Sequence, residues 1–334
     1  MTLGTTFRIA IIGGGPAGLS LAIALKRKGF DNLVVYEREK NDGVRHQGWS
    51  ISLFSPQGGL AFLDHLKLIE EFSVISFEPT FRALDGETGN TLLHRIGSSG
   101  NERRFKRGDL RQALERVAIR EGVKVVWDAQ VKLFEETETK VYVHFVDETR
   151  HPVDIVDLLI GADGIHSPIR KQLTGDEIRP AGFNAVVGLI KKELDGSNDD
   201  LFEHELIKNT GALVSGRNVA CWYAHQVLHN EIYWSLSIKC NEDYIRQRTN
   251  YDKKQLHSLA KEVSQNFFPL IQQMVERTSV EQMQDCLLFK DLDPMKRHPS
   301  GRFCISQTGR ITLIGDAAHA MLPFRGQGIF SFQV

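Results

Sequence analysis

The stretch Gly13-Gly14-Gly15-Pro16-Ala17-Gly18 decides the fold of this chain. It supplies the spacing GxGxxG directly after an apolar run, Phe7 to Ile12, and at the start of a helical pattern, Pro16 to Lys28. The first glycine of the motif permits a tight turn. The second lets the backbone approach a pyrophosphate at the helix N-terminus, and the third allows close helix–strand packing. The pattern predicts the strand, turn and helix of a dinucleotide-binding unit.

An acidic residue completes this unit. A second apolar run, Leu33 to Tyr36, ends at Glu37, which lies 19 positions after Gly18 (37 − 18). A carboxylate at this place accepts hydrogen bonds from adenosine ribose hydroxyls. A glycine turn without any ligand is the competing interpretation, and the motif alone does not separate NAD from FAD.

Two further motifs place aspartates at the ends of apolar strands. The first, Leu158 to Gly164, contains Asp163 and is followed by Ser167 and Arg170; the second, Ile311 to His319, contains Asp316. In open α/β sheets, ligands bind at the carboxyl ends of the strands, so both aspartates are candidate ligand contacts. An NAD dehydrogenase has no use for either motif. We interpret His319 as a structural, hydrogen-bonded histidine in preference to a catalytic one.

Composition restricts the class of partner. The 334 residues are enough for about two domains, and 41 basic residues nearly balance 42 acidic ones. Such a balance does not favour nucleic acid or an anionic membrane surface, which leaves a small molecule. The four cysteines lack metal-ligand spacing, and no apolar run reaches the roughly 20 residues that span a bilayer. We therefore expect a cytoplasmic protein with reduced thiols and no metal.

The remaining patterns predict a second domain. Helical spacing is found at 60–72 and 109–120, and strand patterns at 123–127, in the alternating segment after Val131 and in the continuous run 155–160. Several strand-like segments between Phe183 and Lys239 indicate an antiparallel sheet. A long amphipathic stretch, Tyr251 to Arg277, is broken near Pro269, and the chain returns to a buried-strand pattern at 311–314. The nucleotide-binding domain is thus expected to be discontinuous.

In order and spacing the three motifs resemble the class A flavoprotein monooxygenases, the single-component aromatic hydroxylases of the para-hydroxybenzoate hydroxylase type. The resemblance extends from Phe7 to about Gly328. Four stretches look most like the tetracycline-inactivating monooxygenases and their fungal relatives, namely 13–38, 45–53, 107–114 and 314–328.

The resemblance implies an α/β fold in which a Rossmann-like FAD-binding domain carries an inserted antiparallel substrate domain. We expect residues 1–75, 106–178 and 296–334 in the first and residues 76–105 and 179–295 in the second. The residues that would contact FAD are Gly13, Gly15, Pro16, Ala17, Gly18, Glu37, Arg38, Arg45, Arg107, Arg111, Asp163, Gly315, Asp316, Gly326, Gln327 and Gly328.

Within that set, the resemblance implies different tasks. Arg107 and Arg111 would bind phosphate or ribityl oxygens, and Asp316 a ribityl hydroxyl; a guanidinium suits a dianionic cofactor because it grips phosphate with two aligned donors. Arg111 could instead be a solvated charge on a helix face. Asp163 would tie the flavin site to NAD(P)H, or simply cap a helix. The segment 326–328 would point a helix N-terminus at the flavin pyrimidine.

The activity that the resemblance implies is the hydroxylation of an aromatic or polyketide-like compound. NAD(P)H and O2 would be the co-substrates, a flavin C4a-hydroperoxide the oxidant, and no catalytic side chain would be needed. Candidate pocket residues are Trp222, Tyr233, Pro323 and Phe324, with core packing as the competing interpretation of the aromatic residues.

Two alternatives stay open. One is a flavin-dependent reductase or oxidase on the same fold. The other is an inactive, truncated chain, because the family pattern continues with an asparagine and a long helix where this sequence reads Ile329 to Val334. The substrate, the choice between NADH and NADPH, and the oligomeric state are not fixed by the sequence.

Overall fold

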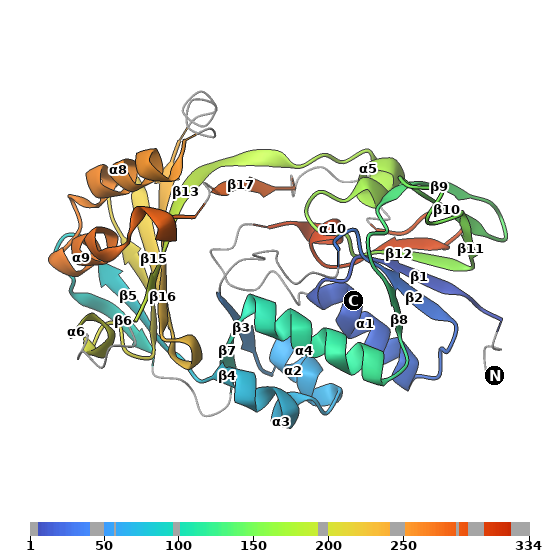
Figure 1. The fold of residues 1–334 in the computed structure, drawn as a ribbon, viewed down its shortest axis with the longest axis horizontal. Coiled ribbons are helices and arrows are strands. Elements are labelled where there is room, and N and C mark those ends of the chain that lie inside the picture. The colour runs from blue at the N-terminus through green and yellow to red at the C-terminus, as the bar shows by residue number, and fades with distance from the viewer. Residues whose placement is uncertain are drawn as a thin grey trace. The chain divides into compact units, whose positions relative to one another are not determined.

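The structure is a computed structural model that describes residues 6–40, 50–56, 58–95, 101–192, 200–240, 251–284, 287–292 and 304–321. It divides into two compact units (Figure 1). The first unit comprises Met1–Gln47, Gly108–Arg179 and Lys290–Val334, and the second comprises Gly48–Arg107 and Pro180–Phe289. Residues 48–75, which we assigned to the FAD-binding domain, therefore cluster with the second unit.

The first unit is built on a five-stranded parallel sheet. Its order is β18 (Ile311–Leu313), β12 (Leu158–Gly161), β1 (Ile9–Ile12), β2 (Leu33–Tyr36) and β8 (Lys124–Val126). Every residue of β1 and β2 is buried, which explains why both were recognisable as continuous apolar runs. Helix α1 (Pro16–Arg27) connects them, so the predicted βαβ unit is present.

The first unit also contains a three-stranded antiparallel sheet, and one of its strands differs from our prediction. It consists of β9 (Val131–Glu136), β10 (Val141–Phe145) and β11 (Asp154–Val156). We predicted a single buried strand over 155–160, but the run is divided at Asp157 between β11 of this sheet and β12 of the parallel one. The division has a physical cause, because the Asp157 carboxylate accepts hydrogen bonds there from the Arg8 backbone N–H and from Lys140.

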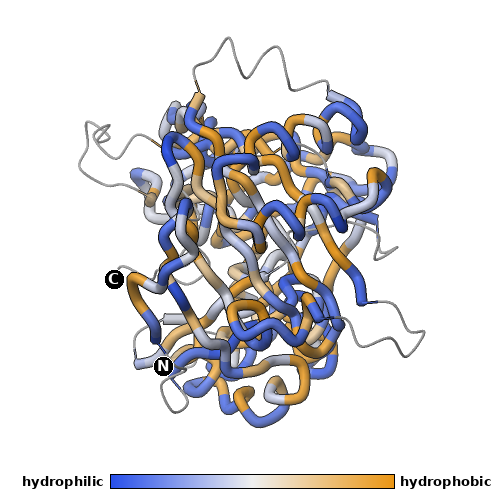
Figure 2. The backbone as a smooth tube through the Cα atoms, turned by 90° about the vertical axis from the view of Figure 1, so that its left-hand side faces the viewer, coloured by the Kyte–Doolittle hydropathy of each residue, from blue (hydrophilic) through white to orange (hydrophobic). Residues whose placement is uncertain are grey.

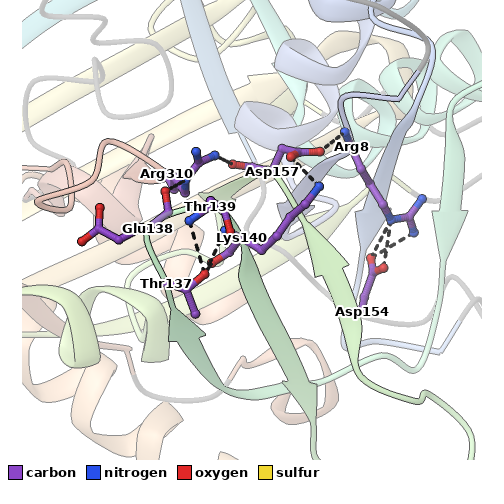
Figure 3. A network of polar contacts seen from close by, with 8 residues as sticks. All are labelled: Arg8, Thr137, Glu138, Thr139, Lys140, Asp154, Asp157 and Arg310. Carbon is purple, nitrogen blue, oxygen red and sulfur yellow. Dashed lines mark hydrogen bonds and ion pairs between the residues drawn. The ribbon is translucent and has the colours of Figure 1, made fainter.

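These polar contacts form a network at the amino ends of the parallel strands (Figure 3). Arg8 donates from Nε to Asp154 at 2.9 Å, and Lys140 donates to Asp157 at 2.6 Å. Arg310, which precedes β18, donates to the Asp157 carbonyl at 3.1 Å. The network joins β1, the β11–β12 connection and the start of β18 at the edge opposite to the carboxyl ends.

Four helices lie in the described residues of the first unit. They are α1, α4 (Arg107–Arg120, beginning at the boundary of the units), α5 (Pro168–Thr174) and the short α10 (Asp316–His319). Helix α4 is amphipathic and buries Leu110, Leu114 and Val117, which is the spacing that predicted a helix at 109–120.

The second unit contains a seven-stranded sheet. Its order is β17 (Leu287–Asp291), β13 (Arg179–Lys191), β16 (Glu231–Lys239), β15 (Val219–Gln226), β14 (Thr210–Ser215), β5 (Thr80–Asp85) and β6 (Thr91–Arg95). Strands β13 to β16 pair antiparallel, as predicted, whereas β14 and β5 pair in parallel.

One face of this sheet is covered by α8 (Lys253–Ser264) and α9 (Pro269–Arg277) (Figure 1). Its core includes the fully buried Cys221, Tyr223 and Trp234. The predicted helical break near Pro269 is confirmed, since this proline is the first residue of α9. Figure 2 shows the corresponding pattern, with orange apolar stretches along strands and helices and blue segments at many turns.

The rest of the second unit is a small antiparallel sheet and short helices. The sheet has the order β3 (Ser50–Phe54), β7 (Glu102–Lys106), β4 (Ser76–Phe77). The helix that we predicted over 60–72 is two helices, α2 (Gly59–His65) and α3 (Ile69–Phe72), because Lys67 adopts a left-handed φ of 51° between them. A further short helix is α6 (Asp200–Glu203). Single 3-10 turns are η1 (Ser73–Ile75), η2 (Val227–His229) and η3 (Val280–Gln282). Across the described segments, no helix is long and apolar enough to cross a bilayer.

Candidate cofactor site

The carboxyl ends of four adjacent parallel strands meet at one edge of the first unit's sheet. Asp316 follows β18, and Asp163 follows β12. The glycine turn follows β1, and Glu37 follows β2. Backbone hydrogen bonds continue just past the strands, from Gly13 to Tyr36 at 2.8 Å and from Ala162 to Ile12 at 2.7 Å. All three motifs of the sequence therefore lie on neighbouring strands at the same edge.

The glycines of the turn are required by close backbone approach. Gly13 has a φ of 115°, and a Cβ at this position would lie 2.3 Å from the Ala162 carbonyl oxygen. A Cβ on Gly18 would lie 2.0 Å from the Gly13 oxygen. Both values are far below van der Waals contact, so the turn fits against β1 and the end of β12 only without side chains.

Gly15, between these two glycines, faces open space. No atom lies within 4 Å of where a Cβ of Gly15 would be, and Gly15 is the N-cap of α1 without a side-chain cap. Pro16 occupies the first helical position, which needs no N–H partner. The first turn of α1 thus has both the room and the free backbone donors that a pyrophosphate needs.

Glu37 holds the middle of the glycine turn. Its carboxylate is buried and accepts hydrogen bonds from the N–H of Gly14 at 2.7 Å and from the N–H of Glu39 at 3.0 Å. A carboxylate offers about four acceptor positions, so capacity remains for two ribose hydroxyls. Arg38, the neighbouring predicted contact, is an exposed side chain.

Arg111 reaches the same turn from α4. Its Nε donates to the Gly14 carbonyl at 3.0 Å, and its guanidinium carbon lies 5.2 Å from the ring centre of Trp127. The side chain is only 9% exposed, so the alternative of a solvated surface charge is wrong. Its NH2 nitrogen is buried without a hydrogen-bond partner among the described residues. A buried cationic donor of this kind calls for an anionic or polar ligand.

Asp163 contributes in part to the capping of α5, and its predicted link to NAD(P)H stays a prediction. Ser167 is the N-cap of α5, and Asp163 adds a weak hydrogen bond from the Ile169 N–H at 3.4 Å. Its other carboxylate oxygen is buried without a partner in the described part of the chain, and burial raises its pKa. Capping therefore accounts for one oxygen of Asp163 and leaves the second unexplained.

Arg170 joins the second and third motifs. Its guanidinium donates to the backbone carbonyls of Ile165 at 2.6 Å, Ala317 at 3.1 Å and Asp316 at 3.2 Å. The second motif thereby fixes the backbone of the third, which was not apparent from the sequence because the two motifs lie about 150 residues apart.

The third motif lies against the first turn of α1. Gly315 has a φ of 59°, and a Cβ there would lie 2.9 Å from that of Ala17. Asp316 is the first residue of α10 and is partly buried. His319 has no hydrogen-bond partner at Nε2 among the described residues, so the expected bond is not found at that atom.

The remaining predicted residues have different outcomes. Arg107 is the half-buried first residue of α4. Six fall outside the described residues: Arg45, Pro323, Phe324, Gly326, Gln327 and Gly328. Trp127, which packs against Arg111, was missed, although its position at the end of the strand predicted at 123–127 was a usable signal.

The four sheet aromatics divide between two faces. Tyr223 and Trp234 are directly paired and fully buried in the core under α8 and α9. Trp222 and Tyr233 point to the opposite face and are half-buried, and burial raises the pKa of Tyr233 to about 12. Core packing is therefore the right interpretation for the first pair, whereas the second pair stays a pocket candidate.

Comparison with known proteins identifies the family of this chain and the cofactor that these residues fit. A family model described as an FAD binding domain matches residues 6–330. This chain belongs to that family, the class A flavoprotein monooxygenases. The free end of α1, the carboxylate of Glu37 and the unpaired donor of Arg111 fit the pyrophosphate, the ribose and an anionic oxygen of FAD.

Individual members of the monooxygenase family resemble the chain over nearly its whole length. It is 27% identical over 344 residues to the FAD-dependent monooxygenase thnD of Trichoderma harzianum, covering 96% of this chain and 78% of that protein. HpxO of Klebsiella pneumoniae, solved with FAD and uric acid, superposes with a TM-score of 0.77 at 22% identity, over 97% of this chain and 77% of that one. The tetracycline destructase Tet(51) superposes with a TM-score of 0.63 at 19% identity, over 96% of this chain and 77% of that one. At these identities the two structures show the shared fold.

Proposed function

We propose that this chain binds FAD at the carboxyl edge of the parallel sheet and uses NAD(P)H and O2 to hydroxylate an aromatic or polyketide-like small molecule. One observation carries the cofactor assignment. The glycine turn is held from both sides, by Glu37 and by Arg111, and Arg111 keeps a buried donor without a partner among the described residues. Such a donor costs free energy unless a ligand satisfies it, which supports an anionic cofactor.

In this proposal each side chain binds one part of the cofactor. The free N–H groups of α1 bind the pyrophosphate, Glu37 accepts the adenosine ribose hydroxyls, and Arg111 donates to a phosphate or ribityl oxygen. Asp316 accepts a ribityl hydroxyl, and the second oxygen of Asp163 serves the side where NAD(P)H arrives. FAD, when bound, supplies the transfer of two electrons from NAD(P)H to O2 and the insertion of one oxygen atom into the substrate.

The substrate class is supported by the relatives. HpxO was solved with uric acid, which is a heteroaromatic compound, and Tet(51) is named for the destruction of tetracycline. These two compounds are associated with the relatives and not with this chain. For this chain they support a planar, electron-rich substrate in preference to an aliphatic one.

Oxygen incorporation is the experiment that tests this function. The purified protein should show the absorbance of bound flavin, and its NAD(P)H oxidation should increase with a suitable member of an aromatic panel. With 18O2, a monooxygenase places one labelled atom in the product. Bound flavin with hydrogen peroxide as the sole oxygen product would instead establish an oxidase, and reduction of a compound without O2 consumption would establish a reductase.

A further inference from the structure

Arg104, in the middle of β7, is a fully buried cation in the second unit. Its side chain is 1% exposed, although it belongs to a basic segment that reads as a solvated face. A Cβ on Gly211 would lie 2.4 Å from its NH2 nitrogen, so the guanidinium lies directly over this glycine of β14. The rings of Phe77 and Trp222 are centred 6.0 Å from its guanidinium carbon. Arg104 therefore lies on the face of the seven-stranded sheet that α8 and α9 do not cover.

Arg104 forms no direct ion pair with the described residues, although the Glu102 carboxylate favours its charged form from a distance. Its hydrogen bond to the Ser52 hydroxyl is long, at 3.5 Å, and its NH1 nitrogen has no partner among them. The nearby Glu102 is engaged by Arg95 at 2.5 Å. Burial lowers the pKa of Arg104 to about 10, which still leaves it charged at neutral pH. A buried charge without a partner is costly, and an anionic ligand that paired with it would offset that cost.

A second buried donor lies on the same face. Gly211 pairs directly with Ala224, and Gln226 follows two residues later on β15, so its side chain points to the same side. Gln226 is 2% exposed, and its Nε2 has no hydrogen-bond partner in the described part of the chain. The neighbouring carboxylate of Glu231 is occupied by Lys106 at 2.9 Å. Arg104 and Gln226 therefore each keep a buried donor without a partner among the described residues.

We propose that Arg104 and Gln226 form an anion subsite that receives a carboxylate or phenolate oxygen of the substrate. The inference rests on the proposed function, because it assigns the aromatic substrate of that reaction to this face. Phe77 and Trp222 are half-buried and flank the guanidinium, so they separate it from solvent and offer planar surfaces to an aromatic ring. The substrate class is accordingly an aromatic anion, and Arg104 is its specificity-determining residue.

Calorimetric titration of the FAD-loaded protein with benzoate, and with its neutral analogue benzamide, tests the subsite without turnover. We expect benzoate to bind at least 10-fold more tightly than benzamide. Arg104→Met should remove this preference and raise the Tm of the protein without benzoate, because a buried unpaired charge is replaced by an apolar chain of similar length. Gly211→Ala should also remove it, because a methyl group at that position displaces the end of the Arg104 side chain.

Arg103→Met is the matched control. Arg103 is the preceding residue on β7 and points away, donating to the Ser76 hydroxyl at 2.7 Å and to the Ser73 carbonyl at 3.1 Å. This variant loses the same charge from the same strand and should keep the preference for benzoate.

Three results would overturn the subsite: no preference for benzoate in the original protein, a preference that survives both Arg104→Met and Gly211→Ala, or an equal loss in Arg103→Met. The flavin spectrum and NAD(P)H oxidation of the same preparations report on the proposed function separately. Absence of substrate-dependent NAD(P)H oxidation in these FAD-loaded preparations contradicts the proposed function and leaves the result of the titration standing.

Discussion

Arg111 of α4 donates from Nε to the carbonyl of Gly14 at 3.0 Å, while the N–H of the same glycine donates to Glu37 at 2.7 Å. The central residue of the glycine turn is thus held on both sides, at its N–H and at its carbonyl, by side chains from two other segments. The turn that would receive the cofactor is therefore shaped before the cofactor arrives, which lowers the ordering cost of binding.

Arg111→Met should weaken FAD binding by about 10- to 100-fold, since a hydrogen bond to a charged group contributes about 1.5–3 kcal/mol. The variant loses both the bond to Gly14 and the buried NH2 donor. Titration of the apoprotein followed by flavin fluorescence measures the change. Arg116→Met, an exposed position on the same helix, serves as the control and should bind FAD as the original chain does.

Glu37→Ala should weaken FAD binding by about 1–3 kcal/mol, because it removes charge-assisted acceptors for the ribose hydroxyls and also releases Gly14. Equilibrium dialysis with FAD gives the affinity directly. Glu39→Ala removes a carboxylate two residues away but keeps the backbone N–H that bonds Glu37. Equal losses in both variants would show that overall negative charge, and not the Glu37 geometry, governs binding.

Gly315→Ala should destabilise the first unit by more than a second glycine substitution, Gly175→Ala. Both glycines have positive φ, 59° and 72°, so both variants carry backbone strain of about 1 kcal/mol or more. Only Gly315 also meets a neighbour, Ala17, whereas nothing lies within 4 Å of a Cβ on Gly175. Urea unfolding of the two variants compares their free energies, and similar values would contradict the close packing of the third motif against α1.

Asp157 should make stability depend on acid pH. Burial alone would raise the pKa of its carboxyl, but the hydrogen bonds from Lys140 and from the Arg8 N–H outweigh it, so the pKa in the folded protein is lowered. A lowered pKa stabilises the fold above the ordinary value of about 3.9 and loses that contribution as the pH falls through the folded value.

The advantage of the original chain over Asp157→Asn should therefore be full near neutral pH and shrink in acid. Urea unfolding at a series of pH values measures it. Lys140→Met removes the partner that lowers the pKa of Asp157 most, so the stability of this variant should depend less on acid pH than that of the original chain. An advantage that stays constant into strong acid would contradict the assignment.

The strands around the glycine motif were predictable because their chemistry leaves few alternatives. Fully buried strands are continuous apolar runs, and the glycines of the motif are imposed by contacts as close as 2.0 Å. The same local reasoning was wrong at Asp157, since one polar residue within an apolar run can be part of one strand or, as here, a partly buried junction between two sheets.

Features that depend on distant segments were not accessible in this way. The parallel pairing of β5 with β14 joins residues 130 positions apart (Thr80 and Thr210), and no local pattern specifies it. Arg104 was not among the predicted site residues, because it packs against Gly211, which is 107 positions later (211 − 104). Sequence periodicity reports which side of a strand is apolar, but not which element will cover the other side.

The position of β18 beside β12 has a consequence for synthesis on the ribosome. The outer edge of β12 ends at Gly161, and its partner begins 150 residues later at Ile311 (311 − 161). At about 5–20 residues per second, the nascent chain displays this unpaired apolar edge for roughly 8 to 30 s, while all of residues 180–289 are being made. Unpaired strand edges invite association between chains, so slower translation lengthens the time during which this edge is open to aggregation.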